Sequence, residues 1–514
     1  MRRRLLLVHP SRLAGENQGV YEQHVVSLQT LLGPADGWQV HALDPAHPSF
    51  PDAALAAELV IVHMLSAPEI ESVIRLRRAR GLSTIFEISD NFLDIGDWVP
   101  ARHALRNPLV RQRIVYHASI ADAVQVYAGG LAALCRHIHP RILQFDPYVP
   151  LPAPAVREDD RLVIGWGGST SHEHDLAPIA PVIEDMCRLR DDVVFAFMGN
   201  QAMGERLFGR VPATQRRMRA FGDFTSYLAF VGTWHIGLAP LGDSGFNACR
   251  TDTKLAIYAA CGVAPVAETG EAYRLHRDHA LLYRGVDGLR TALQSLCLDR
   301  SRIDRLAARA RAWVERERDP GRLRAQRVRA YEPFIARETG EDLTISDSRP
   351  ALDGDVMALR ATVRAHPGHA QARLTLADAL RDSGDETGAL DVLDARPFPP
   401  VLAGLAAERQ HALAERVRPE RAGDYAARVD APVARLRLAG RHSGHRAFLR
   451  ALLEQQPFDY FALSSRLREL LAGDPGAAEL RDLCWRACLV APELVPEALR
   501  PPSLARFLPA GATP

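Results

Sequence analysis

The chain has 514 residues, of which 47% are hydrophobic and 24% charged, and its formal net charge is +1. That length exceeds what a single hydrophobic core supports and predicts about three domains. The near-neutral overall charge gives no indication of binding to nucleic acid or to an acidic membrane surface, and it leaves local charged patches open.

The cysteine pattern indicates the compartment. Seven cysteines, an odd number without any CxxC spacing, predict reduced thiols in a cytoplasmic protein. No apolar run approaches the length of a membrane span, so any membrane contact is expected to be peripheral. No grouping of cysteines, histidines and carboxylates in the sequence indicates a metal site.

Residues 1–150 alternate short apolar runs with helical patterns, which is typical of parallel βαβ units. Helical patterns cover Val20–Leu32 and Ala67–Ala79. The expected strands are Leu5–Val8, Leu59–His63, Thr84–Ile88, Ala123–Val126 and Arg141–Phe145. A proline-rich linker, Pro147–Asp160, follows and ends this first domain.

Residues 151–340 repeat the alternation and predict a second doubly wound α/β domain. Residues 341–514 lack strand patterns and are rich in Ala, Leu and Arg, which predicts an all-α region. Within it, Pro367–Pro397 is similar to a tetratricopeptide unit, although a generic helical bundle fits nearly as well. The predicted strands of the second domain are Leu162–Gly165, Val193–Met198, Ile236–Ala239 and Ala264–Ala267, with a helix at Thr253–Cys261.

Two segments of the second domain carry candidate chemistry. In the first, a buried strand leads into Gly167, Gly168 and Ser169 and then into a helix start with His172. Glycines let a ligand approach the backbone, and a helix start favours an anion. A glycine turn alone is also common in αβ units, and a solvated first-turn histidine is the plain alternative for His174.

The second segment contains Lys254, the single lysine of the chain, among 63 lysine and arginine residues. Arg250 lies four residues earlier, so both cations share a face if the helix begins near Arg250. Thr251, Asp252 and Thr253 are able to cap that helix. Two cations at a helix N-terminus predict a diphosphate site, with a solvated charged helix start as the alternative.

Together these segments resemble a GT-B glycosyltransferase of the family 4 type, found among bacterial glycan-building enzymes. The resemblance covers about residues 1–340 and is most specific in the second domain. It implies two Rossmann-like domains, the first for the acceptor and the second for a nucleotide-sugar donor. The matching positions are Gly165, Trp166, Gly168, Ser169, His172, Asp175, Leu176, Pro240, Leu241, Phe246, Asn247, Arg250, Thr251, Asp252, Lys254, Ala260, Gly262 and Val263.

By this resemblance Lys254, Arg250 and His172 are catalytic. The donor-binding set is Gly167, Gly168, Ser169, Asn247, Thr251 and Asp252. On the acceptor side, the match is looser and names Gly19, His63 and Asp90. A capped strand-end histidine is an equal alternative for His63.

One departure concerns ribose binding. The family carries a glutamate three residues after the lysine, where this chain has Ile257. Either Glu268 or Glu271 in the following loop replaces that carboxylate, or the site has decayed.

The resemblance therefore implies a metal-independent, retaining glycosyltransferase without a cofactor. Its acceptor would be a protein, such as a flagellin or another surface protein, or a glycan. The helical region is expected to bind a partner protein. The competing hypothesis from a different class is a non-catalytic GT-B-like scaffold in a glycan-assembly complex.

Overall fold

The computed structural model describes residues 2–10, 18–97, 99–153, 155, 160–335, 343, 345, 352, 355–429, 445–472 and 477–509. The expected domain boundary at residues 340 and 341, and part of the linker near residue 157, lie outside these. Within the described residues, no helix combines the length and apolar content needed to cross a bilayer. All seven cysteines are buried free thiols.

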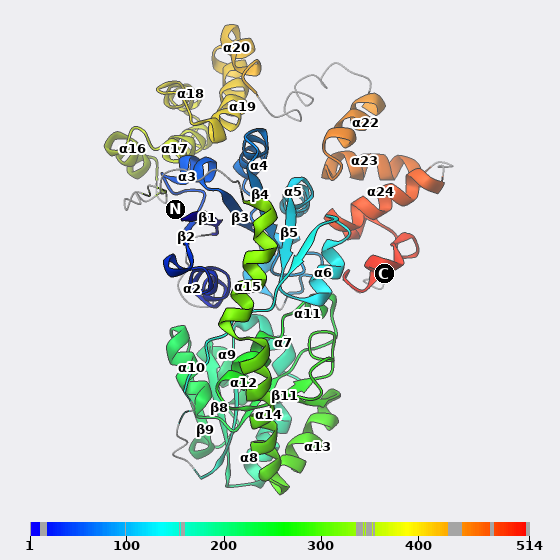
Figure 1. Cartoon of the computed structure of the whole chain (residues 1–514). Coiled ribbons are helices and arrows are strands. Elements are labelled where there is room, and N and C mark those ends of the chain that lie inside the picture. The colour runs from blue at the N-terminus through cyan, green and yellow to red at the C-terminus, as the bar shows by residue number, and fades with distance from the viewer. Residues whose placement is uncertain are drawn as a thin grey trace.

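Two parallel sheets of six strands each form the body of the molecule (Figure 1). The first runs β2 (Trp38–Leu43), β1 (Arg3–Val8), β3 (Leu59–His63), β4 (Ser83–Glu87), β5 (Ala123–Val126) and β6 (Ile142–Gln144). The second runs β12 (Leu281–Tyr283), β11 (Ala264–Glu268), β10 (Ile236–Ala239), β7 (Leu162–Gly167), β8 (Val193–Gly199) and β9 (Arg216–Ala220).

Helices flank both sheets, so the predicted class of two doubly wound Rossmann-like domains is confirmed. Those of the first domain are α1 (Gln18–Tyr21), α2 (Ser27–Leu31), α3 (Phe50–Ala56), α4 (Glu69–Ala79), α5 (Pro108–Ile120) and α6 (Gly129–Cys135), with the π-helix η2 (Glu22–Val26) between α1 and α2. Those of the second are α7 (Glu173–Leu176), α8 (Ala180–Leu189), α9 (Gln201–Phe208), α10 (Phe224–Gly232), α11 (Gly245–Ala248), α12 (Thr253–Ala260), α13 (Gly285–Leu298) and α14 (Ser301–Glu317).

The strands that the sequence pattern missed are β2, β9 and β12, and all three lie at sheet edges. The central strands β1, β3, β7 and β8 are buried along nearly their whole length and have continuous apolar runs. An edge strand is covered less completely, so it tolerates polar residues and loses the apolar signature. Strand β9, which contains three arginines, is the clearest case.

Helix α15 (Pro320–Tyr331) crosses back from the second domain to the first (Figure 1). Its Leu323 and Tyr331 are buried in one apolar cluster with Leu5 and Leu7 of β1. The sequence assigned this helix to the second domain, whereas its packing ties the two domains together.

The C-terminal region is helical, as predicted, and forms two groups (Figure 1). In the first group α19 packs on α4, and in the second α24 packs on α5. Both groups share one core with a face of the first sheet. The expected helix pair is α17 and α18, and its identity as a tetratricopeptide unit stays a prediction. The first group contains α16 (Val356–Ala365), α17 (Ala370–Asp382), α18 (Glu386–Asp394), α19 (Pro400–Val417) and α20 (Ala422–Ala426), and the second α22 (His445–Gln455), α23 (Tyr460–Leu471), α24 (Ala477–Val490) and α25 (Pro502–Ala505).

The two Rossmann-like domains are joined at α11. The buried side chain of Asn91 donates from Nδ2 to the carbonyl oxygens of Gly245 and Phe507, each at 2.9 Å. Asp94 accepts from the backbone N–H of Phe246 at 3.1 Å. We call these contacts of Asn91 and Asp94 the seam. It connects the first domain, the second domain and the C-terminal segment, and it lies at one side of the space between the sheets.

Candidate functional site

A pocket open to solvent lies between the two Rossmann-like domains. It is at the carboxyl ends of β7 and β10 and at the N-terminus of α12, where ligands of open α/β sheets bind. The first domain contributes Val20, Glu22 and Gln23. The second contributes Gly167, Gly168, Ser169, His172, Phe221, Gly222, Asp223, Phe224, Tyr227, Leu241, Arg250, Thr251, Thr253, Lys254, Ile257 and Tyr273.

Lys254 lies along the glycine turn that follows β7. Its Nζ donates to the carbonyl oxygen of Gly167 at 2.7 Å and lies 4.6 Å from the ring centroid of Trp166. Burial lowers the pKa of Lys254 to about 7, and the nearby Arg250 cation adds to the effect. Burial and the neighbouring cation thus disfavour the charged form of Lys254. A bound anion would stabilise that charged form.

Because Gly168 has no side chain, the side chain of Lys254 has room to lie beside it. A Cβ at this position would lie 2.9 Å from Trp166 and 3.0 Å from Nζ of Lys254. Its backbone N–H donates to the carbonyl oxygen of Met198 at 3.0 Å. The amide of Gly168 is therefore committed within the protein, and the residue contributes room rather than a hydrogen bond to a ligand.

Arg250 joins the two domains across the pocket. Its Nη1 lies 3.2 Å from Oδ1 of Asp90 in the first domain, and its Nη2 donates to Oγ of Ser171 at 3.3 Å. The guanidinium also packs over Phe246, at 4.4 Å from the ring centroid. The structure brings Arg250 and Lys254 to one pocket, although α12 begins at Thr253, so Arg250 precedes the helix and does not share a helix face with Lys254.

His172 is held by a buried carboxylate. Its Nδ1 donates to Oδ2 of Asp175 at 2.8 Å, and Oδ1 of Asp175 accepts from the N–H of Gly242 and from Nδ2 of Asn247, each at 2.8 Å. Burial and the cation of Lys254 lower the pKa of His172 to about 4. A neutral imidazole is therefore fixed at the pocket wall, with Nε2 as its remaining ring nitrogen. Asn247 positions Asp175 and does not line the pocket.

Three predicted donor-binding carboxylates point elsewhere. Asp252 pairs with Arg318 at 2.5 Å and with His276. Glu268 accepts from the N–H of Gly285 at 2.8 Å. Glu271 pairs with Arg274, and neither Glu268 nor Glu271 lines the interdomain pocket.

Sequence reasoning missed one wall of the pocket, formed by the β9–α10 loop and the start of α10. Phe221, Phe224 and Tyr227 present aromatic rings there, and Asp223 contributes a carboxylate. Asp223 also caps α10, since its Oδ1 accepts from the N–H of Ser226 at 2.6 Å. The loop follows the edge strand β9, which the sequence pattern missed. The sequence therefore gave no indication that this loop lies next to the glycine turn.

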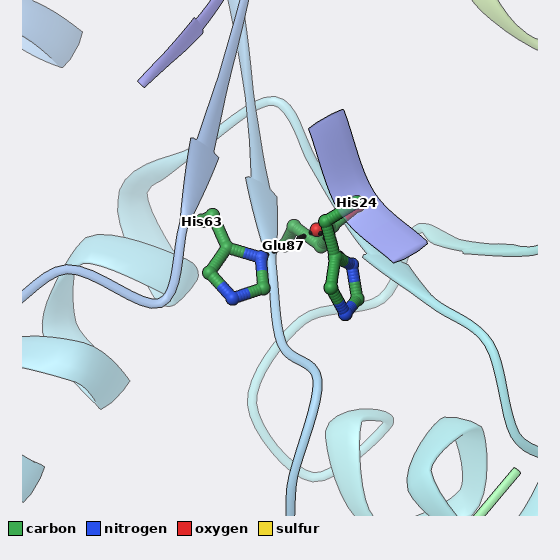
Figure 2. A group of neighbouring side chains, drawn as sticks. All are labelled: His24, His63 and Glu87. Carbon is green, nitrogen blue, oxygen red and sulfur yellow. Dashed lines mark hydrogen bonds and ion pairs between the residues drawn. The ribbon is translucent and has the colours of Figure 1, made fainter. Parts of the chain in front are cut away.

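The first domain carries a buried group at the carboxyl edge of its sheet. His63 ends β3, Glu87 ends β4 and His24 belongs to η2; Figure 2 shows both imidazoles flanking the carboxylate. His9, after β1, stacks on His63 with 4.5 Å between ring centroids. The sequence predicted His63 alone. Gly19, which the sequence also named on the acceptor side, lies in α1.

No protein-family model matches the chain, and no curated protein matches it in sequence. Among solved structures it is similar to S. aureus TarM in complex with UDP, at 9% identity and a TM-score of 0.43 over 53% of this chain and 55% of TarM. It is also similar to Anabaena HepE in complex with UDP and glucose, at 11% identity and a TM-score of 0.45 over 65% of this chain and 100% of HepE.

A third solved structure, an O-GlcNAc transferase mutant of Thermobaculum terrenum, aligns at 16% identity and a TM-score of 0.40 over 65% of this chain and 67% of that one. The chain thus spans about half the length of TarM. Likeness at these identities concerns the fold alone, so the function has to be argued from the residues of the pocket.

Proposed function

We propose that this chain is a glycosyltransferase that binds a nucleotide-sugar donor in the interdomain pocket. The observation that carries the proposal is the convergence of Lys254, Arg250 and the N-terminus of α12 on one pocket at the carboxyl ends of parallel strands. Cations and a helix N-terminus favour a diphosphate. The resemblance of the same residues to glycosyltransferases of the family 4 type supports the assignment.

The two cations would act on the leaving group. When the glycosidic bond to the diphosphate breaks, negative charge grows on the phosphate oxygens, and Lys254 and Arg250 are placed to stabilise it. We propose that these side chains make a metal ion unnecessary at the diphosphate. Neutral His172, whose Nδ1 donates to Asp175, would accept a hydrogen bond at Nε2 from a sugar hydroxyl without adding charge. Retention of anomeric configuration is part of the proposal and follows the family that the motif resembles.

The remainder of the donor would lie against the wall formed by the β9–α10 loop. Aromatic rings of Phe224 and Tyr227 offer faces for a nucleobase. Ile257 lines the pocket one turn after Lys254 and cannot hydrogen-bond a ribose. Asp223 is the carboxylate of the second domain that borders the pocket, so we propose that Asp223 takes the ribose role that the sequence assigned to Glu268 or Glu271.

The acceptor would approach from the first domain, where Gln23 lines the pocket and Asp90 holds Arg250. We propose a protein or glycan acceptor in the cytoplasm, the compartment that the free cysteine thiols favour. The helical region would supply a surface for an acceptor or partner protein.

A second candidate function is a non-catalytic scaffold, and Ile257 favours it because a pocket without the usual ribose carboxylate has lost a donor contact. A thermal-shift screen of UDP-, GDP- and dTDP-sugars, followed by detection of released nucleotide with candidate acceptors, separates the two. A ligand that binds only the folded state raises the melting temperature. Absence of any shift across the panel would refute the donor site and leave the scaffold.

A further inference from the structure

The buried group of His24, His63 and Glu87 has the composition of a metal site. Among the residues that the structure describes, these three form the group whose ligand atoms lie within 4.8 Å of one another. All three side chains are buried, with Glu87 at 1% exposure. They come from η2, β3 and β4, and Figure 2 shows them facing one another.

The two oxygens of Glu87 have different surroundings. Oε2 accepts from Nε2 of Gln125 and from the hydroxyl of Tyr127 at 3.0 Å. Oε1 lies 2.6 Å from Nδ1 of His63 and 2.8 Å from Nδ1 of His24. One oxygen is therefore anchored by hydrogen bonds while the other meets two imidazole nitrogens, which is how proteins orient a carboxylate that binds a metal.

Gln125 and Tyr127, which donate to Glu87, are themselves hydrogen-bonded to residues of α15. Arg327 of α15 donates to the hydroxyl of Tyr127 at 3.1 Å, and the hydroxyl of Tyr331 donates to Oε1 of Gln125 at 2.6 Å. Both α15 residues are buried. The helix that crosses between the domains thus fixes the orientation of the Glu87 carboxylate.

Nδ1 of His24 supplies an independent observation. It is buried and has no hydrogen-bond partner among the described residues, although it lies 2.8 Å from Oε1 of Glu87. The contact between Nδ1 of His24 and Oε1 of Glu87 is therefore an ion-pair distance that does not meet hydrogen-bond geometry. A buried polar nitrogen without a partner costs free energy, and an ion bound between the three groups would satisfy it.

We propose that His24, His63 and Glu87 bind one divalent first-row transition metal ion, with zinc as the reference metal. Two nitrogens and one carboxylate oxygen are ligands that Zn²⁺ accepts, and three protein ligands leave a fourth position open. Zinc bonds of about 2.0–2.1 Å with tetrahedral angles separate the ligand atoms by about 3.3 Å. Side-chain rotations that move these atoms apart by about 0.5–0.7 Å therefore admit the ion.

The open position would face the acceptor side of the interdomain space. His24 lines a cavity there together with Asp90, Arg250 and Thr251. A water or an oxygen of an acceptor is the class of ligand that reaches it. The three proposed ligands all belong to the first domain, whereas Lys254 and Arg250 supply the positive charge of the proposed donor pocket.

The test uses the full-length chain after removal of metal with a chelator. We expect calorimetric titration with Zn²⁺ to show one ion per chain, and Co²⁺ to produce visible absorption bands at the same stoichiometry. Glu87→Gln is isosteric and keeps an oxygen for Gln125 and Tyr127. It should weaken Zn²⁺ binding by at least about 100-fold, since even outer hydrogen-bond partners cost 10–100-fold.

Three further variants make the result decisive. Tyr127→Phe should weaken Zn²⁺ binding about tenfold through the freed Oε2. His24→Gln is the second ligand variant if Glu87→Gln does not fold, as judged by circular dichroism. His117→Gln removes another buried imidazole of the first domain, 3.1 Å from the carbonyl of Leu65, and should leave binding unchanged. A wild type that binds neither ion, or a folded ligand variant that binds as the wild type does, overturns the proposal.

Discussion

Replacement of Lys254 by alanine is the most direct perturbation of the proposed donor pocket. The substitution removes the ammonium that lies 2.7 Å from the carbonyl of Gly167 and over the ring of Trp166. It leaves Arg250 and the backbone of α12 in place. We expect the variant to fold and to bind a nucleotide sugar more weakly, because one cation of the diphosphate site is gone.

The magnitude follows from the contact and its burial. A hydrogen bond to a charged group contributes about 1.5–3 kcal/mol. Lys254 remains partly exposed, which favours the lower part of that range. A loss of about 1.5–2 kcal/mol is a roughly 10- to 30-fold weaker affinity, at 1.4 kcal/mol per tenfold. Lys254→Arg should recover only part of it, because a planar guanidinium does not reproduce the contacts of the compact ammonium with Gly167 and Trp166.

The same residue sets a pH dependence. In the free protein the pKa of Lys254 is about 7, well below its ordinary value of 10.5. A bound diphosphate favours the charged amine and raises that pKa, so binding takes up a proton above pH 7. Affinity should be constant below about pH 6 and fall toward tenfold per pH unit above about pH 7, until the pKa of the bound state is passed.

The assay is calorimetric titration between about pH 6 and pH 9, with a nucleotide sugar that shifts the melting temperature and whose diphosphate diester does not titrate there. Arg274→Ala is the matched control, since it removes one exposed cation of the same domain outside the pocket. An affinity of Lys254→Ala within about twofold of the wild type, or an unchanged pH profile in that variant, would refute the reasoning.

Three further substitutions test neighbouring features. Gly168→Ala should weaken nucleotide-sugar binding about tenfold, because its Cβ would lie 2.9 Å from the buried ring of Trp166 and 3.0 Å from Nζ of Lys254; unchanged titration would refute this. Asp223→Asn keeps the cap on Ser226 but removes the charge, so ribonucleotide sugars should lose more affinity than 2′-deoxy analogues, and equal losses would exclude a ribose contact. Asn91→Ala leaves two buried carbonyls unpaired at about 1–3 kcal/mol each, so the melting temperature should fall; an unchanged value would show that the seam contributes nothing.

The sequence predicted best where the determining contacts are local. The central strands β1, β3, β7 and β8 have continuous apolar runs because both sheet faces are covered. Arg250 and Lys254 were predicted to share one helix face if the helix began near Arg250, but α12 begins at Thr253 and Arg250 lies in the segment before it. The structure brings both to the pocket with Gly168 and His172, which lie at the neighbouring strand end.

Prediction failed where the sequence pattern does not show which way a side chain points. Glu268 ends β11 and Glu271 follows it at the right edge of the sheet, yet contacts with Gly285 and Arg274 take their carboxylates away from the pocket. Asp223 borders the pocket because an edge strand brings its loop back to the glycine turn. Because β9 is short and rich in arginine, the sequence pattern did not predict it as a strand, and the position of the following loop could not be inferred.

The single lysine, the glycine turn and the alternation of strands and helices were determined by the sequence itself, because each depends on residues close together in the chain. Only the tertiary structure decided that α15 crosses to the first domain and that both C-terminal helix groups share its core. It also decided that His24, His63 and Glu87 meet. They belong to different elements, and parallel strands bring their carboxyl ends to one edge only after the sheet has formed.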